Sequence, residues 1–282
     1  EGERKADFTN PTEIGFQLLA YLGAGSEGMK LLSKEEAWKK IEGLIVTLER
    51  LQKEGYKQSL FYRGYIAGTE KSHVKETEYD HEVSSVDNAN LAASLLVIRE
   101  ALRRENRKAL LAKIDAMLSK MDFSVWLDKE TGLFYMGASE EPQAGPRWDY
   151  YSNEGRIIPV VAYILGNIDR EQFKTCMEAF KRVALKTEDG TGEVKNVNYG
   201  GASFTYMLPA LFLKELETSY GTETVEPMFR AQIEYARERG YEVWGRSDVT
   251  FNGDYLMPVS YTHLRAHETS LHLVCRLLLE KK

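Results

Sequence analysis

The chain has 282 residues, of which 43% are hydrophobic and 28% charged, and its formal net charge is −6. These values are typical of a globular protein with one large domain or two smaller ones. The acidic balance argues against a general nucleic-acid binder, which would present a basic surface. Two cysteines, Cys176 and Cys275, do not make a disulfide framework. No apolar run reaches the roughly 18 residues that a membrane span needs.

Helical periodicity dominates the chain, because apolar residues recur at the spacing of one helix face. The first expected helix starts at a clear signal: Asn10 as N-cap, Pro11 at the first helical position and Glu13 three residues after the cap. Ser33 marks the second helix in a similar way, with acids in its first turn. The expected helices are 11–24, 34–54, 88–104, 107–121, 152–166, 169–187, 203–219 and 222–240.

Short and long connections alternate between these helices. The long connections are rich in aromatic residues, glycine and charge, and they are 56–87, 122–151, 188–202 and 241–259. Such alternation predicts helical hairpins whose long loops gather at one end. Loops of this length in a compact domain are usually functional or carry small strands of their own. We therefore expect an all-α architecture of stacked hairpins, with a candidate site on the loop face.

The stretch "HEVSSVDNANLAASLLVIREAL" places Glu82 and Asp87 where a loop gives way to a helix. Ser84 and Asp87 fit a capping box, so a structural role for Asp87 is the simpler interpretation. A capped helix start is also a rigid place to hold a catalytic carboxylate. The preceding loop supplies Tyr62 and Arg63. Aromatic rings, an arginine and convergent acids at the mouth of a helical bundle suit a site for sugars.

A second group lies in "RWDYYSNEGR", where Trp148, Tyr150 and Tyr151 precede Glu154 and Arg156. A carboxylate that stabilises a helix N-terminus is the alternative interpretation of Glu154. Its aromatic neighbours, and the helix-breaking glycine and proline that follow it, favour a role in a shaped site.

Two later clusters complete the candidate site. "NVNYGGASFTYMLP" carries Tyr199 beside two glycines, which permit a close backbone approach. "YEVWGRSDVTF" carries Trp244 and Asp248 on either side of an arginine. If the hairpins close into a ring, all four clusters converge.

Converging acids with aromatic platforms fit the cleavage of glycosidic bonds. One carboxylic acid protonates the leaving oxygen, and a second carboxylate activates water or attacks directly. Partial burial among Trp and Tyr side chains would raise the pKa of the acid. The candidate catalytic residues are Glu82, Asp87 and Glu154. The sequence leaves open which is the acid, which is the base, and whether the reaction retains or inverts configuration.

In these motifs the chain resembles the glycoamylase-like family, which includes endo-β-1,2-glucanases and a module of cyclic β-1,2-glucan synthases. The matching blocks follow in the family's order: "TNPTEIGFQLL", "SSVDNANLAA", "MDFSVWLDKETGLFY", "WDYYSNEGR", "GGASFTYMLP" and "VWGRSD". The resemblance implies an α/α barrel, a toroid of up to six helical hairpins, that acts on a β-glucan. It places Glu82, Asp87 and Glu154 at acidic positions of the site, with Arg156 beside the last.

The chain departs from this family pattern at two positions. Thr205 stands where relatives often carry an acid, and Asp248 stands in for a glutamate. The change at Thr205 keeps two alternatives to a hydrolase open, a non-catalytic glycan-binding protein and a transglycosidase on the same fold. A helical scaffold whose acids are all caps is a third alternative. A polysaccharide lyase is disfavoured, because it would usually need histidine and a basic cleft.

The end of the chain, "YTHLRAHETSLHLVCRLLLEKK", matches no block of the family and looks like translated adapter sequence. We therefore expect one domain over 1–259, incomplete at its C-terminus, followed by a non-native tail over 260–282. The tail's His267 and His272 are five positions apart, whereas a zinc-binding helix needs four, so no metal is assigned.

The expected partner is an oligo- or polysaccharide, and we expect no cofactor, no nucleic acid and no membrane segment in this chain. No signal peptide is recognised in the sequence, which begins at Glu1 rather than Met and so leaves an upstream segment open. The resemblance favours a periplasmic or extracellular location.

Overall fold

A computed structural model of the chain is mostly helical and divides into two compact units. Unit 1 comprises Glu1–Asp149 and Gly155–Phe180, and unit 2 comprises Tyr150–Glu154 and Lys181–Lys282. The structure describes residues 8–66, 82–138, 145–186, 193–198, 202–242, 244–245, 249–251 and 254–256. The tail predicted from residue 260 onward, with His267 and His272, lies outside these ranges.

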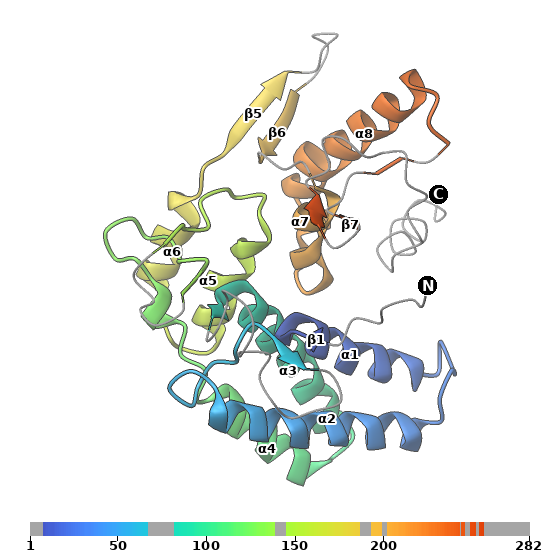
Figure 1. The fold of residues 1–282 in the computed structure, drawn as a ribbon, viewed down its shortest axis with the longest axis vertical. Helices are drawn as coiled ribbons and strands as arrows, with labels where there is room; N and C mark the ends of the chain where they lie inside the picture. Colours follow the sequence, from blue (N-terminus) through green and yellow to red (C-terminus); the bar gives the residue numbers. More distant parts are fainter. Residues whose placement is uncertain are drawn as a thin grey trace. The chain divides into compact units, whose positions relative to one another are not determined.

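The described residues of unit 1 form six α-helices (Figure 1). They are α1 (Pro11–Ala24), α2 (Lys34–Glu54), α3 (Ser85–Arg104), α4 (Lys108–Leu118), α5 (Ile157–Ile164) and α6 (Arg170–Ala179). The bounds predicted for α1 and α2 are confirmed, because both helices start at complete capping boxes. Asn10 pairs with Glu13 in the first, and Ser33 pairs with Glu36 in the second.

Helix α3 is the centre of unit 1. It packs against α1, α4 and α5, and its apolar side chains, such as Leu91 and Leu95, are fully buried. The crossing with α1 is close at Gly15, where a Cβ atom would lie 2.8 Å from Ser94 Oγ and 3.2 Å from the Leu91 Cα atom. Glycine lets the two helix backbones approach, and this approach brings the start of α1 to the start of α3.

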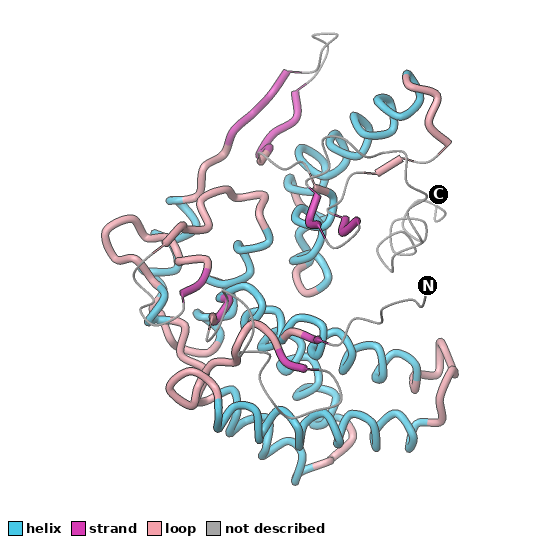
Figure 2. The backbone as a smooth tube through the Cα atoms, in the orientation of Figure 1, coloured by secondary structure: helices cyan, strands magenta, loops and turns pink. Residues whose placement is uncertain are grey.

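The long loops carry short antiparallel strands, so the all-α expectation holds for the helices but not for the connections (Figure 2). The pairs are β1 (Phe8–Thr9) with β2 (Tyr65–Ile66), β3 (Val83–Ser84) with β4 (Gly137–Ala138), β5 (Val183–Lys186) with β6 (Glu193–Val197), and β7 (Val249–Phe251) with β8 (Asp254–Leu256). In unit 1, β1 and β3 run directly into α1 and α3, so these pairs tie the long loops to the two helix starts.

Unit 2 departs most from the expected helices. Its elements after the β5–β6 hairpin are α7 (Ser203–Met207), 3-10 turns over Leu208–Leu211 and Lys214–Glu217, a π-turn over Gly221–Val225 and α8 (Glu226–Glu238). The helix predicted over 203–219 is wrong, because Pro209 follows α7 and cannot donate the hydrogen bond that would continue it. The helix predicted over 169–187 ends at Ala179, because residues 183–186 pair with β6 instead.

Two further observations concern the described residues alone. No described helix is long and apolar enough to cross a membrane. Within the same ranges, no group of three or more His, Cys, Asp and Glu side chains is placed to hold a metal ion.

Cys176 on α6 is 1% exposed, and burial raises the pKa of its thiol to about 11. The prediction of a buried, unreactive thiol at this position agrees with both values. The closed ring of hairpins stays a prediction.

Candidate active site

The start of α3 holds together separate loops of unit 1. The hydroxyl of Ser85 lies 2.7 Å from the carbonyl oxygen of Tyr135 and 2.9 Å from that of Met136. The indole N–H of Trp148 donates to the same Ser85 oxygen at 3.1 Å. Ser85 is fully buried, so these bonds are shielded from water. One side chain thereby fixes both the β4 segment and the ring of Trp148.

Asn88, one turn later, holds the loop that carries Tyr62 and Arg63. Its Nδ2 donates to the carbonyl oxygens of Phe61 and Ser84, each at 2.9 Å, and its Oδ1 accepts the Phe61 N–H at 2.8 Å. Asn88 is fully buried. A buried amide that satisfies a loop backbone in this way positions the loop firmly.

Asp87 is oriented by helix α1. The Thr12 hydroxyl donates to Asp87 Oδ1 at 2.5 Å, and Asn90 Nδ2 donates to Thr12 Oγ1 at 3.2 Å. The predicted capping box is present in one direction, since Ser84 Oγ accepts the Asp87 N–H at 3.3 Å. The carboxylate itself bonds Thr12 rather than closing the box. Its position is therefore set by a contact between two helices, and the side chain is half-buried.

Glu82 and Arg63 form an ion pair that was not predicted from the sequence. Arg63 NH1 is 2.8 Å from Glu82 Oε2, and the Arg63 N–H donates to the Glu82 carbonyl oxygen at 2.7 Å. The carboxylate side chain is 23% exposed and the guanidinium side chain 50%. Next to this pair, the N–H of Tyr62 donates to the hydroxyl of Tyr65 at 2.9 Å, and burial raises the pKa of Tyr65. The structure thus gives Glu82 a fixed cationic partner.

Trp148 lies against the backbone of Gly155. A Cβ atom at Gly155 would come within 2.3 Å of Trp148 Cγ, so no larger residue fits there. This contact explains the glycine that the sequence places just after Glu154. Arg156, the next residue, is 1% exposed and is the N-cap residue of α5. A substrate-binding role for Arg156 stays a prediction.

Next to Trp148 in the sequence, Arg147 forms an ion pair that was not predicted. Arg147 Nε lies 2.5 Å from Asp128 Oδ2, and the Arg147 guanidinium covers the Tyr135 ring at 4.8 Å. The hydroxyl of Thr131 donates to Asp128 at 2.8 Å. This hydrogen bond is the largest cause that holds the pKa of Asp128 below its usual range, and the Arg147 ion pair adds to it.

Glu154 belongs to unit 2, where it follows a tyrosine pair. The N–H of Tyr151 donates to the Lys181 carbonyl oxygen at 3.1 Å, and the Lys181 ammonium lies 5.5 Å from the centre of the Tyr150 ring. Tyr150, Tyr151 and Glu154 are all half-buried. Since Glu82 and Asp87 belong to unit 1, the convergence of the three acids stays a prediction.

The departure from the family pattern at Thr205 has a clear local structure. The Thr205 hydroxyl donates to the Ala202 carbonyl oxygen at 2.8 Å and accepts from Asn198 Nδ2 at 3.1 Å. The same Asn198 amide donates to Asn153 Oδ1 at 3.2 Å, and Asn153 is the neighbour of Glu154. Hydroxyl and amide groups thus occupy the position where relatives often carry an acid.

The remaining predicted residues are only partly placed. Trp244 is half-buried and meets Phe229 edge to face, with ring centres 5.6 Å apart. Tyr199 and Asp248 lie outside the described residues. The sequence analysis did not single out Thr12, Asn90 or Asn198. Thr12 stands in a helix-start motif, and its link to a residue 75 positions away has no local signal.

The fold described above is shared with solved β-1,2-glucanases. The endo-β-1,2-glucanase of Talaromyces funiculosus, in complex with sophorose, matches with a TM-score of 0.70 at 13% identity, over 91% of this chain and 59% of that one. The endo-β-1,2-glucanase of Chitinophaga pinensis matches with a TM-score of 0.72 at 18% identity, over 91% of this chain and 65% of that one. At these identities the likeness shows the fold alone.

A sequence relative points to the same group. The cyclic β-(1,2)-glucan synthase NdvB of Rhizobium meliloti (strain 1021) is 33% identical over 98 residues, which are 35% of this chain and 3% of that protein. No protein-family model matches the chain. The resemblance inferred from the motifs is confirmed, because these neighbours are β-1,2-glucanases and a β-1,2-glucan synthase. The chain spans only part of each of them.

Proposed function

We propose that the chain carries a glycoside hydrolase domain that cleaves a β-glucan, with β-1,2 linkages as the first substrate to test. The observation that carries the proposal is the match over 91% of the chain to an endo-β-1,2-glucanase solved with sophorose. Glu82 and Asp87 support it, because both acids are held at the start of the central helix by contacts from other segments.

The proposed chemistry uses one acid as proton donor to the glycosidic oxygen and another as proton acceptor from water, or as nucleophile. Asp87 and Glu154 are the candidates for these two roles, and which takes which role stays open. Glu82 pairs with Arg63 at 2.8 Å, so we assign it to orientation and charge balance beside the reacting groups. The aromatic residues Tyr62, Trp148, Tyr150 and Tyr151 are the proposed platforms for sugar rings.

The test compares Asp87→Asn and Glu154→Gln with the unchanged protein on β-1,2-glucan. Loss of a general acid or base should lower turnover by at least about a hundredfold without unfolding the protein. Asp115→Asn is the matched control, since Asp115 lies on α4 in a half-buried ion pair with Arg99 on the far end of α3 from Asp87, and it should retain activity within about twofold. Full turnover by both site variants would reject the assignment.

A glycan-binding protein without catalysis is the second candidate function. The hydroxyl and amide groups around Thr205 favour it, because they replace an acid that relatives often carry. It predicts measurable binding of β-1,2-gluco-oligosaccharides in calorimetry with no product after long incubation. Release of shorter oligosaccharides by the unchanged protein would exclude this candidate, and a redistribution of chain lengths would indicate a transglycosidase.

A further inference from the structure

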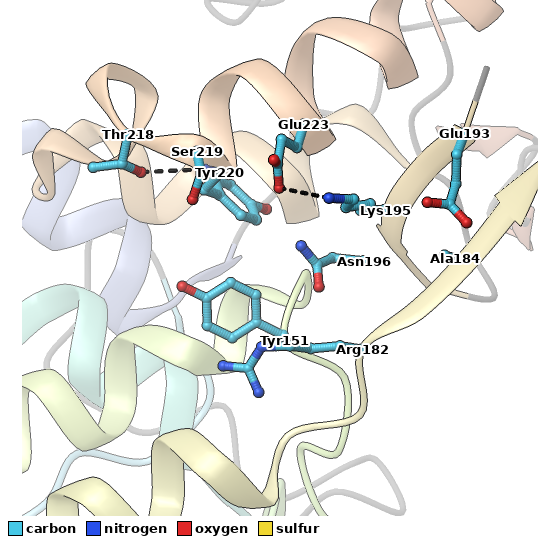
Figure 3. A pocket seen from close by; sticks show the side chains of 10 residues that line it. All are labelled: Tyr151, Arg182, Ala184, Glu193, Lys195, Asn196, Thr218, Ser219, Tyr220 and Glu223. Atoms are coloured by element: carbon cyan, nitrogen blue, oxygen red, sulfur yellow. Dashed lines mark hydrogen bonds and ion pairs between the residues drawn. The ribbon is translucent and has the colours of Figure 1, made fainter.

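Unit 2 contains a pocket of about 460 Å³ that the sequence analysis did not foresee (Figure 3). Three pieces of unit 2 form it: the segment with Tyr151, the β5–β6 hairpin and the π-turn before α8. The volume falls within the roughly 300–1,000 Å³ that small-molecule sites occupy.

The backbone around the pocket contains features that are unfavourable on local grounds. Asn196 has a φ of 53°, in the left-handed region that few residues other than glycine adopt. The register of β5 and β6 shifts between Val183 and Leu185, and a π-turn spans Gly221–Val225. Left-handed residues, bulges and π-turns concentrate at functional sites. Their presence around one pocket is the first argument for a binding role.

The charge of the lining is balanced. Lys195 Nζ lies 3.0 Å from Glu223 Oε2, and the lining adds Arg182 and Glu193, one more charge of each sign. A pocket with no excess charge has little to attract a free anion or cation. Its carboxylates accept hydrogen bonds and its cations donate them, so it matches a neutral ligand whose groups both donate and accept. Sugar hydroxyls are such groups.

Two tyrosine side chains, Tyr151 and Tyr220, line the pocket and contact each other. The rings of Tyr151 and Tyr220 meet edge to face, with centres 5.6 Å apart, and the Arg182 guanidinium lies 4.3 Å from the centre of the Tyr151 ring. Tyr220 is 4% exposed. The amide of Asn196 donates to Thr224 Oγ1 at 2.8 Å, and Figure 3 shows this amide between Tyr151 and the Lys195–Glu223 pair. Aromatic rings and paired polar groups around one space are typical of carbohydrate sites.

We propose that this pocket binds a short stretch of a neutral glycan, and that Asn196, Lys195 and Glu223 hold its hydroxyl groups. The choice of a β-glucan as the glycan rests on the function proposed above. Tyr151 is shared with the sugar platforms of that function, whereas the other nine lining residues take no part in it.

The experiment measures affinity for sophorose and for longer β-1,2-gluco-oligosaccharides by calorimetry, with Asp87→Asn as background to prevent turnover. Asn196→Gly keeps the left-handed backbone accessible and removes the amide. Glu223→Gln removes the ion pair with Lys195. The control is Arg230→Gln, which breaks the exposed Arg230–Glu226 pair on α8. Both pocket variants should weaken binding at least about tenfold, while the control binds as the background protein does.

Equal affinity in the pocket variants and the control would overturn the proposal. Product analysis with the unchanged protein separates this outcome from a failure of the proposed function. Products together with pocket-independent affinity would remove the pocket and keep the hydrolase. Pocket-dependent affinity without products would keep the pocket and remove the hydrolase. A protein that neither binds nor cleaves would contradict both.

Discussion

Thr12 stands between Asn90 and Asp87 at the point where α1 and α3 begin. Because Asn90 Nδ2 donates to Thr12 Oγ1, the hydroxyl proton is directed to Asp87 Oδ1, 2.5 Å away. Asn90 is 1% exposed, so the donor that orients Thr12 is itself shielded from water, whereas Thr12 and Asp87 are half-buried. Thr12 thus has the features of a positioning residue, which sets the direction of the carboxylate without itself reacting.

Replacing Thr12 tests this role at the scale of one residue. Thr12→Val keeps the shape and removes the hydroxyl, so kcat should fall about tenfold to a hundredfold through misplacement of the carboxylate, with KM little changed. Thr12→Ser keeps the hydroxyl and should stay near the unchanged protein. Steady-state kinetics on β-1,2-glucan, together with thermal melts of both variants, make the comparison. The same kcat in the valine and serine variants would contradict the role.

The elements show which parts of the fold have local signals. The bounds of α1 and α2 were predicted correctly, because each capping box lies within four consecutive residues. Strand β5 was taken for a helix because its pairing with β6 depends on a partner across the hairpin. The break before Pro209 does have a local signal, which the prediction of one long helix overrode.

The crossing of α1 and α3 gives a prediction at the scale of elements. Gly15→Ala should destabilise the protein by about 1–3 kcal/mol, although alanine is the better helix former, because the new methyl group meets Ser94 Oγ and the Leu91 backbone. Gly43→Ala on α2 is the control, since nothing lies within 4 Å of a Cβ atom there. It should stabilise by about 0.4–1 kcal/mol. Urea unfolding of both variants would refute the close crossing if Gly15→Ala stabilised as Gly43→Ala does.

The ion pair of Arg147 with Asp128 gives a prediction for pH. Hydrogen bonds from Thr131 and the Arg147 ion pair hold the pKa of Asp128 below its usual value of 3.8. A carboxyl group whose pKa is lower in the folded state than in the unfolded state adds stability at pH values above the unfolded-state pKa. This stability is lost as the pH falls through the folded-state pKa. Asp128→Asn should therefore be less stable than the unchanged protein at pH 7, with a difference that shrinks below about pH 4. Denaturant unfolding at both pH values checks this. A constant difference would assign the effect to packing.

For the whole molecule, the sequence motifs predicted the resemblance to β-1,2-glucanases, whereas the contacts that hold the candidate residues came from the structure. Glu82 and Arg63 were expected at the same candidate site, but the ion pair between them was not predicted from the sequence and is a finding of the structure. The contact between Thr12 and Asp87 joins residues 75 positions apart, and a single sequence carries no signal for such a pair. The unit 2 pocket was not predicted for a related reason, because β5 and most of the π-turn that build it were expected to be helical.

The most direct measurement is product analysis after incubation of the protein with β-1,2-glucan, with β-1,3- and β-1,4-glucans in parallel. The central proposal predicts short oligosaccharides from β-1,2-glucan, and their loss in Asp87→Asn. All three glucans unchanged, with the fold verified by circular dichroism and a cooperative thermal melt, would contradict a hydrolase.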